Sequence, residues 1–297
     1  MQETQKSTAY VKAALYMLLA MAMWAVIENI PRYFSQHYTT FETVWMRYSI
    51  HLLFMLVVFG PRVKLRLVRT QRLGQQIVRG MLMLGMHLAF IFAIRSISVN
   101  ATMSVFWISP LLLLGLSAWL GERANWKVWA GVAVAFGFVL IILRPVSAAF
   151  HPGALLGVLM AVCFVIYLQM TRAMKGEDIL ASLFYTAFSV WIVLSFVMPF
   201  VWVTPNGFDL LLFAAIGLLG YVCIFSFDKA AELAPTWVSA PFAFIQPVLI
   251  IISEWTLRNY FPGRLSLGLA GLIVLYLIFI LLQNTAVKRL LPGYHHV

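Results

Sequence analysis

Long continuous apolar runs, separated by short polar or charged turns, fill nearly the whole sequence. In the segment 101–145, two runs flank the charged turn Gly-Glu-Arg-Ala-Asn-Trp-Lys. Each run has about 20 residues, enough for a helix to cross a hydrocarbon core of about 30 Å. Because the runs are continuous rather than alternating, they favour membrane-spanning helices over barrel strands.

This pattern predicts an all-α membrane protein with ten transmembrane helices, five in each half of the chain. The expected spans are 11–34, 43–59, 77–94, 99–120, 126–143, 153–171, 180–203, 210–227, 237–257 and 265–283. The first run is long and is followed by no small-residue cleavage site, so we interpret it as a retained helix and not a signal peptide. The expected divisions are a polar, mobile tail (1–10), a first five-helix repeat (11–145), a second (152–284) and a C-terminal tail (285–297).

The second half of the sequence aligns with the first at a constant offset. A shift of 137 residues places Pro110 on Pro247 and Gly131 on Gly268 without a gap. Any two apolar helices align passably, but a proline and a glycine shared in one register favour duplication of the chain. Each proline removes a backbone donor at mid-helix, so both helices should kink there and both prolines are candidate hinges.

Composition excludes a soluble domain. Hydrophobic residues make up 63% of the chain and charged residues 10%, against about 25% charged in soluble domains. The net charge of +11 would suggest nucleic-acid binding in a soluble protein. With the N-terminus in the cytoplasm, however, 15 of the 21 basic residues fall at cytoplasmic ends of the spans and 6 at outer ends. The charge therefore predicts both termini inside at the cell inner membrane, and no nucleic-acid partner.

An odd number of spans in each half gives the two halves opposite orientations. Such inverted repeats recur in transporters that work by alternating access, with the substrate held near the bilayer midplane at the repeat interface.

Short motifs between residues 79 and 145 give the chain a family resemblance. They are Arg79-Gly80, Phe-Ile-Phe-Ala-Ile at 90–94, Ser109-Pro110, Leu-Gly-Glu-Arg at 120–123 and Leu-Arg-Pro at 143–145. With them the chain resembles the EamA-type carriers of the drug/metabolite transporter superfamily. The Arg-Thr-Gln-Arg loop at 69–72, Arg79 and Arg144-Pro145 make it most similar to the branch with S-adenosylmethionine and riboflavin uptake carriers. The resemblance implies two five-helix inverted repeats and transport of a small organic metabolite.

The second half departs from the family pattern. About twelve residues after Pro247, where related carriers have a Gly-Glu pair, this chain has Asn259, and Glu254 lies five residues earlier. The end of the first span, Glu-Asn-Ile-Pro-Arg at 28–32, is also unusually polar. Substrate identity therefore does not transfer directly from the uptake carriers.

Ionisable groups at membrane depth are candidate functional residues, because burying them there is costly. His87 is expected either to bind substrate or carry a proton, or to be a neutral ring bonded to a backbone carbonyl. Glu28 is expected to contact a cationic substrate group or to pair with Arg32 four residues on. Arg47 and His51 lie four residues apart on one helix face and could bind an anionic group, but a structural bond to Glu42 or to a helix end is the favoured interpretation.

Aromatic residues at interior depth form a second group of candidates. Aromatic rings can stack on flat or cationic substrates, although most interior rings simply pack. The repeat mates Trp107 and Phe244 lie three residues before the kinking prolines and are predicted, with Gln246, to line the central cavity. The full aromatic set is Trp24, Phe90, Trp107, Phe164, Tyr167, Tyr221 and Phe244.

Three classes of membrane protein can be compared with these residues: an ATP-driven pump, a secondary transporter and a membrane-embedded enzyme. No phosphate-binding loop of the ATPase type is present, and Cys163 and Cys223 suggest neither a disulfide framework nor a metal site. We predict a secondary transporter without cofactor for a small metabolite that is flat or cationic. An amino-acid or drug exporter is the alternative within transport. A membrane-embedded enzyme is the alternative class, with His87 and Glu28 as its candidate pair. The sequence leaves the direction of transport, the coupling proton or other ion, and the oligomeric state open.

Overall fold

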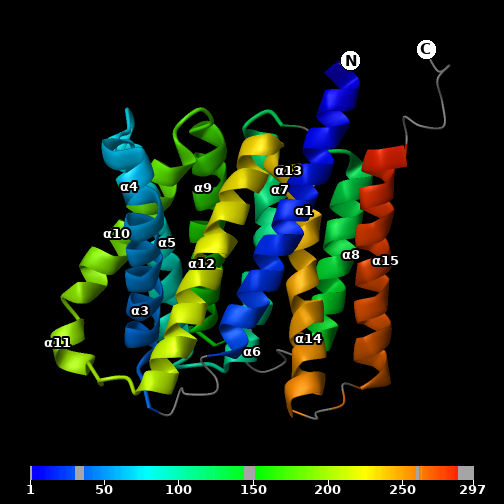
Figure 1. Cartoon of the computed structure of the whole chain (residues 1–297). Helices are drawn as coiled ribbons and strands as arrows, with labels where there is room; N and C mark the ends of the chain where they lie inside the picture. Colours follow the sequence, from blue (N-terminus) through cyan, green and yellow to red (C-terminus); the bar gives the residue numbers. More distant parts are fainter. Residues whose placement is uncertain are drawn as a thin grey trace.

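The computed structural model describes residues 2–30, 37–122, 124–143, 151–258, 261 and 263–286, and these form helices and their connections without any strand (Figure 1). In chain order the α-helices are α1 Gln2–Asn29, α3 Thr40–Phe54, α4 Gly60–Val63, α5 Leu73–Ala93, α6 Val99–Phe106, α7 Ser109–Trp119, α8 Trp126–Leu143, α9 Ala154–Ala173, α10 Ile179–Ser195, α11 Met198–Val201, α12 Gly207–Leu233, α13 Thr236–Ser239, α14 Ile245–Arg258 and α15 Arg264–Ala286. A π-helix at Met55–Phe59 and 3-10 turns at Lys64–Leu67 and Ala240–Phe244 continue neighbouring helices.

Ten apolar helical segments make up the bundle. In the described part of the chain, nine are long and apolar enough to cross a membrane, and Ile179–Ser195 is a shorter tenth. This tenth segment, α10, is followed after a two-residue turn by α11, whose second residue is Pro199. The prediction of an all-α membrane protein with ten transmembrane helices is therefore confirmed.

Several predicted boundaries are wrong by a turn or more. The first helix already begins at Gln2, so residues 2–10 are helical rather than a mobile tail, and it ends at Asn29. The connection between the expected spans 43–59 and 77–94 is largely helical, since it contains α4, a 3-10 turn and the first residues of α5, which begins at Leu73. Hydropathy marks only the apolar part of a helix, while the backbone hydrogen-bond ladder continues into polar residues beyond it. Residues 31–36, 144–150 and 287–297, which include Arg32, Arg144 and Pro145, lie outside the described residues.

The helices of the two halves interlock in symmetric pairs. With α1, α3 and α5 matched to α9, α10 and α12, the packing of α1 on α12 has its mate in α5 on α9 (Figure 1). The packing of α3 on α12 likewise has its mate in α5 on α10. This exchange of partners is what inverted repeats produce when each half completes the other's core.

Two glycines 137 residues apart permit two of these contacts. A Cβ atom on Gly80 would lie 2.5 Å from Ser189 Cβ on α10, and one on Gly217 would lie 2.5 Å from Ile50 Cβ on α3. Small residues at such positions let helix backbones approach closely. The spacing equals that between the two kinking prolines, so the register found in the sequence extends to the helix contacts.

The fourth and ninth spans are both interrupted beside those prolines. The fourth breaks at Trp107 and Ile108, and Pro110 is the second residue of α7. The ninth passes through the 3-10 turn Ala240–Phe244, and Pro247 is the third residue of α14. Each break falls just before the proline rather than at it, because proline is tolerated in the first turn of a helix but not inside one.

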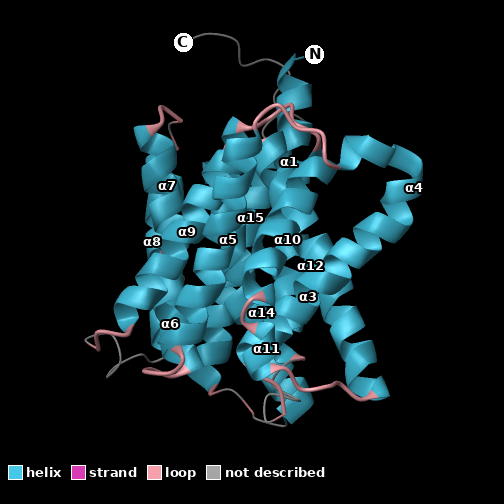
Figure 2. Ribbon diagram, turned by 90° about the vertical axis from the view of Figure 1, so that its left-hand side faces the viewer, coloured by secondary structure: helices cyan, strands magenta, loops and turns pink. Residues whose placement is uncertain are grey.

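The two ends of the bundle differ in charge. We call the end where α1 begins, uppermost in Figure 1, the N-terminal end. Figure 2 shows α4 at the edge of the bundle towards this end. The α4–α5 region exposes five basic side chains there: Arg62, Lys64, Arg66, Arg69 and Arg72.

Candidate binding cavity

A cavity of about 270 Å³ occupies the middle of the bundle and extends towards the end opposite the N-terminal end. Helices of both repeats form its wall, namely α1, α3, α5 and the start of α6 from the first and α9 and α12 from the second. The lining residues are Trp24, Ile27, Glu28, Tyr38, Thr40, Thr43, Val44, Arg47, Met83, Met86, His87, Phe90, Ile94, Val99, Met160, Phe164, Ile216, Cys223, Ile224 and Phe227. A largely apolar wall with a few polar groups is the usual form of a small-molecule site.

Three aromatic rings form the inner wall of the cavity. The ring of Trp24 lies 5.7 Å from that of Phe164 and 5.9 Å from that of Phe227, and the two phenylalanine rings lie 5.3 Å apart. The three contacts have edge-on geometry, which is favourable for aromatic pairs. We call these three residues the aromatic floor, since they lie where the cavity ends towards the N-terminal end.

One acidic and two basic side chains face the cavity: Glu28, Arg47 and His87. His87 contacts the backbone oxygen of Met83 through its Nδ1 at 2.8 Å, and because a carbonyl only accepts, Nδ1 carries the proton. This bond leaves Nε2 as the second polar atom of the ring. Glu28 accepts a hydrogen bond of 3.0 Å from Gln246 Nε2. The third group is Arg47 on α3.

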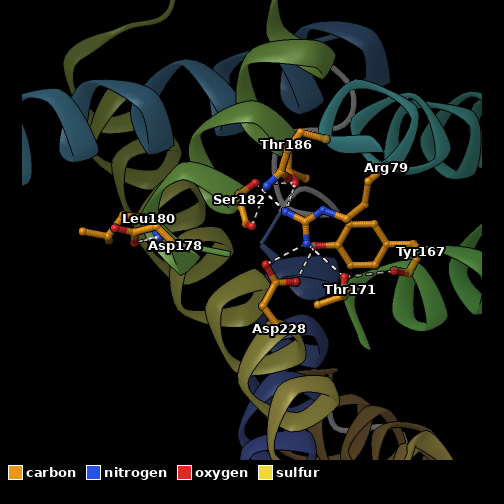
Figure 3. Close-up of polar contacts among 9 residues, drawn as sticks. Arg79, Tyr167, Thr171, Asp178, Leu180, Ser182, Thr186 and Asp228 are labelled. Carbon is orange, nitrogen blue, oxygen red and sulfur yellow. Dashed lines mark hydrogen bonds and ion pairs between the residues drawn. The ribbon is translucent and has the colours of Figure 1, made fainter. Parts of the chain in front are cut away.

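Behind the aromatic floor lies a buried polar cluster centred on Arg79, which Figure 3 shows in close-up. Arg79 is fully buried, and its Nη1 donates 2.9 Å to Oδ2 of Asp228, whose side chain is 2% exposed. Tyr167 donates its hydroxyl to the other carboxylate oxygen of Asp228 over 2.7 Å. The remaining acceptors of the guanidinium are Tyr167 Oη at 3.3 Å, Thr171 Oγ1 at 2.9 Å, the Ser182 backbone oxygen at 2.5 Å and Thr186 Oγ1 at 2.8 Å.

The floor and the cluster share α9 and α12, and α5 links the cluster to the cavity lining. Phe227 directly precedes Asp228 on α12, and Phe164 lies one turn before Tyr167 on α9. On α5, Arg79 lies one turn before the lining residue Met83. An aromatic layer and a hydrogen-bonded polar layer therefore separate the cavity from the N-terminal end.

Contacts between the repeats continue on the surface of that end. Arg66 forms an ion pair of 2.5 Å with Asp178, the residue that caps α10 through the Leu180 backbone N–H (Figure 3). Thr70 donates 2.6 Å to Glu177. The α4–α5 region of the first repeat is thus tied to the α9–α10 turn of the second.

The predicted site residues divide into two groups. Five of them line the cavity, namely Trp24, Glu28, His87, Phe90 and Phe164. Gln246 is fully buried beside it through its bond to Glu28.

The other four lie outside the cavity lining. Trp107 and Phe244 are fully buried with ring centroids 6.3 Å apart, because these rings fill the space where the two interrupted helices meet. Tyr167 belongs to the Arg79 cluster. Tyr221 packs against Phe54, at 5.0 Å between centroids.

Sequence reasoning missed the two central charges of the buried cluster. Arg79 entered the sequence analysis only through a family motif, and Asp228 lies just past the end of the expected span 210–227. The only signal was their opposite charge beside apolar runs, and a separation of 149 residues hid their pairing. Phe227 and Tyr38 also line the cavity but were not predicted as site residues, because hydropathy does not show which helix face meets a cavity.

Together, the ten-helix bundle, the interlocked halves and the central cavity that extends towards one end define a polytopic membrane protein of the transporter class. Residues 11–144 match the EamA-like transporter family, and this match confirms the resemblance drawn from the motifs of that half. The match covers the first repeat, which is the more motif-rich half.

Similar proteins agree with this assignment. The chain is 26% identical over 277 residues to the S-adenosylmethionine uptake transporter of Rickettsia conorii, covering 92% of this chain and 93% of the relative. It is 26% identical over 291 residues to the riboflavin transporter of Rhizobium johnstonii, covering 94% of each. These names indicate transporters and not enzymes. A crystal structure at 16% identity shows the same fold, with a TM-score of 0.80 over 93% of this chain and 98% of the other.

Proposed function

We propose that this protein is a secondary transporter that moves a small organic metabolite across the cell inner membrane by alternating access. The observation that carries the proposal is the one-sided cavity between two inverted repeats. It extends towards the end opposite the N-terminal end, and the aromatic floor and the Arg79 cluster lie across the other side.

In alternating access, the N-terminal end must open to release the substrate while the opposite end of the bundle closes. The Arg79 cluster suits the role of the closure at the N-terminal end, because it joins α5 of the first repeat to α9, α10 and α12 of the second. Its bonds would have to break for the N-terminal end to open. At the opposite end, cross-repeat bonds such as Tyr38 to Asp209, at 2.7 Å, could serve the other closure.

The lining supports a substrate with a flat or cationic part. The aromatic floor and Phe90 offer ring faces for stacking, and Glu28 offers a negative charge. We propose these residues, with His87 and Gln246, as the substrate-binding set. Two relatives are named for S-adenosylmethionine and for riboflavin, and both compounds contain flat ring systems.

We propose that both termini are cytoplasmic. The N-terminal end carries the exposed basic residues of the α4–α5 region, and such charge favours the cytoplasmic side. On this orientation the cavity faces outwards, and the structure corresponds to an outward-facing state.

Uptake by proteoliposomes tests the function. We expect the purified, reconstituted protein to take up radiolabelled S-adenosylmethionine or riboflavin, and a comparison with and without a proton gradient identifies coupling. His87→Ala should reduce uptake at least tenfold, because the ring lines the cavity. His151→Ala is the matched control, since His151 lies in the α8–α9 connection and bonds only to the Gly153 backbone N–H among described groups.

The possible outcomes separate the alternatives. Uptake that exceeds that of protein-free liposomes supports the proposal, and efflux from preloaded vesicles without uptake would favour an exporter. Chemical conversion of the compound without accumulation would overturn the transporter assignment. If His87→Ala transports normally with unchanged pH dependence, His87 is structural.

A further inference from the structure

Arg47 faces the cavity without a counter-ion. It lies on α3, about two turns from the helix start at Thr40. No carboxylate of the described residues forms an ion pair with it, and its Nε is buried without a hydrogen-bond partner. The guanidinium makes a cation–π contact with Tyr48, whose ring centroid lies 5.4 Å from the guanidinium carbon.

The acidic groups described at the same end of the bundle do not bond to Arg47. Glu42 Oε1 accepts a bond of 3.2 Å from the Val203 backbone N–H and its buried Oε2 has no described partner, so the bond predicted from Arg47 to Glu42 is not present. Asp209 accepts from Tyr38 at 2.7 Å and from Asn206 at 2.8 Å. Glu28 accepts from Gln246.

The neighbouring helix is shaped to hold the Arg47 side chain. A Cβ atom on Gly220 of α12 would lie 2.6 Å from Arg47 Nε, 3.2 Å from its Cγ and 3.3 Å from its Cδ. Only glycine leaves this space free, so the bare backbone of α12 forms one side of the slot in which the arginine stem lies.

A cation in this position needs an explanation. An uncompensated guanidinium at membrane depth is costly, and such charges normally face a partner, a cavity or water. Membrane topology does not explain it, because on the proposed orientation Arg47 lies on the outer side, where basic residues are disfavoured. The planar fork of arginine matches carboxylates and phosphates.

We propose that Arg47 binds an anionic group, a carboxylate or a phosphate, of the transported metabolite, and that Gly220 positions the guanidinium. This rests on the proposed transport function and deepens it. Since Glu28 lines the same cavity, the site fits a metabolite with an acidic group beside a cationic one, attached to a ring that the aromatic floor contacts.

Paired probes test the proposal by calorimetric titration of the full-length protein in lipid nanodiscs. One pair is S-adenosylmethionine and its decarboxylated form, which differ by a carboxylate. The other is flavin mononucleotide and riboflavin, which differ by a phosphate. We expect the acidic member of at least one pair to bind roughly 10- to 100-fold more tightly, the range for a hydrogen-bonded charge.

Four variants test whether Arg47 causes the preference for the acidic member of each pair. Arg47→Gln and Gly220→Ala should both reduce it to about twofold or less, and Arg47→Lys should retain part of it because the charge remains. Arg95→Gln is the matched control, since Arg95 is exposed at the same end and outside the cavity lining. Thermal melting checks that each variant is folded, and Arg47→Lys against Arg47→Gln remains informative if Gly220→Ala misfolds.

The outcomes separate this proposal from the transport function. Equal binding of both members of each pair, or a preference that survives Arg47→Gln, overturns the role of Arg47 while uptake of the same compounds still supports transport. Loss of the preference in Arg95→Gln would also overturn it, because the effect would then be long-range charge. If none of the four probes binds, the proposed substrate class fails and this proposal fails with it.

Discussion

Arg79 and Asp228 form an ion pair whose two charges are almost completely removed from solvent. Burying both ions is costly, and the pair persists because hydroxyl groups and a backbone carbonyl bond to every nitrogen of the guanidinium except the buried Nε. Removing one partner is far worse than removing both, since the remaining charge is then left uncompensated. Substituting one partner alone therefore tests how much the Arg79 cluster contributes to stability.

Asp228→Asn should lower the free energy of unfolding by about 3–5 kcal/mol, because it leaves the Arg79 charge buried without its counter-ion. Thermal melting of the purified protein in detergent measures the loss. Glu232→Gln is the control on the same helix, since its partly exposed pair with Lys229 should contribute about 0–1 kcal/mol. Equal melting temperatures for the two variants would show that the Arg79 cluster does not hold the N-terminal end together.

At the scale of elements, the fourth and ninth spans are the least regular parts of the bundle. Each loses regular α-helical geometry just before its proline, and their meeting point is filled by Trp107 and Phe244. Interrupted helices at a repeat interface suit a structure that must rearrange around a fixed site. The packed rings at the interruption make this region a candidate pivot rather than part of the cavity wall.

Pro110→Ala and Pro247→Ala should therefore slow transport more than they weaken binding. We expect turnover to be about tenfold slower, which corresponds to about 1.4 kcal/mol in the activation barrier. The dissociation constant of the substrate should change by less than about threefold. Binding and uptake are measured on the same purified variants. Pro152→Ala, in the exposed turn before α9, is the control. Parental transport rates in both helix variants would disprove the hinge role of these prolines.

For the whole molecule, the interlocked halves tie the orientation of every helix to that of α1. The end that carries the basic α4–α5 region also holds the Arg79 cluster, and the cavity extends towards the other end. Membrane orientation therefore decides which side the cavity faces.

Cysteine labelling in intact cells tests that orientation. Thr204→Cys, in the exposed connection between α11 and α12, should react with an impermeant maleimide from outside. Lys175→Cys, exposed at the N-terminal end, should react only after permeabilisation. The native Cys163 and Cys223 are both buried and should give little background. The reverse labelling pattern would invert the topology and place the cavity on the cytoplasmic side.

The sequence by itself determined the features that depend on neighbouring residues. Continuous apolar runs defined ten crossings, and Pro110 and Pro247 marked the two interrupted helices, because hydropathy and backbone chemistry act locally. Tertiary structure alone decided which interior groups meet the cavity. Trp24 lines it and Trp107 does not, although both are tryptophans of apolar spans. Arg79 forms an ion pair with Asp228, 149 residues further along the chain, whereas Arg47 forms no ion pair among the described residues. Hydropathy measures whether a residue lies within the membrane, but the direction of a side chain in the membrane plane depends on which helices pack beside it.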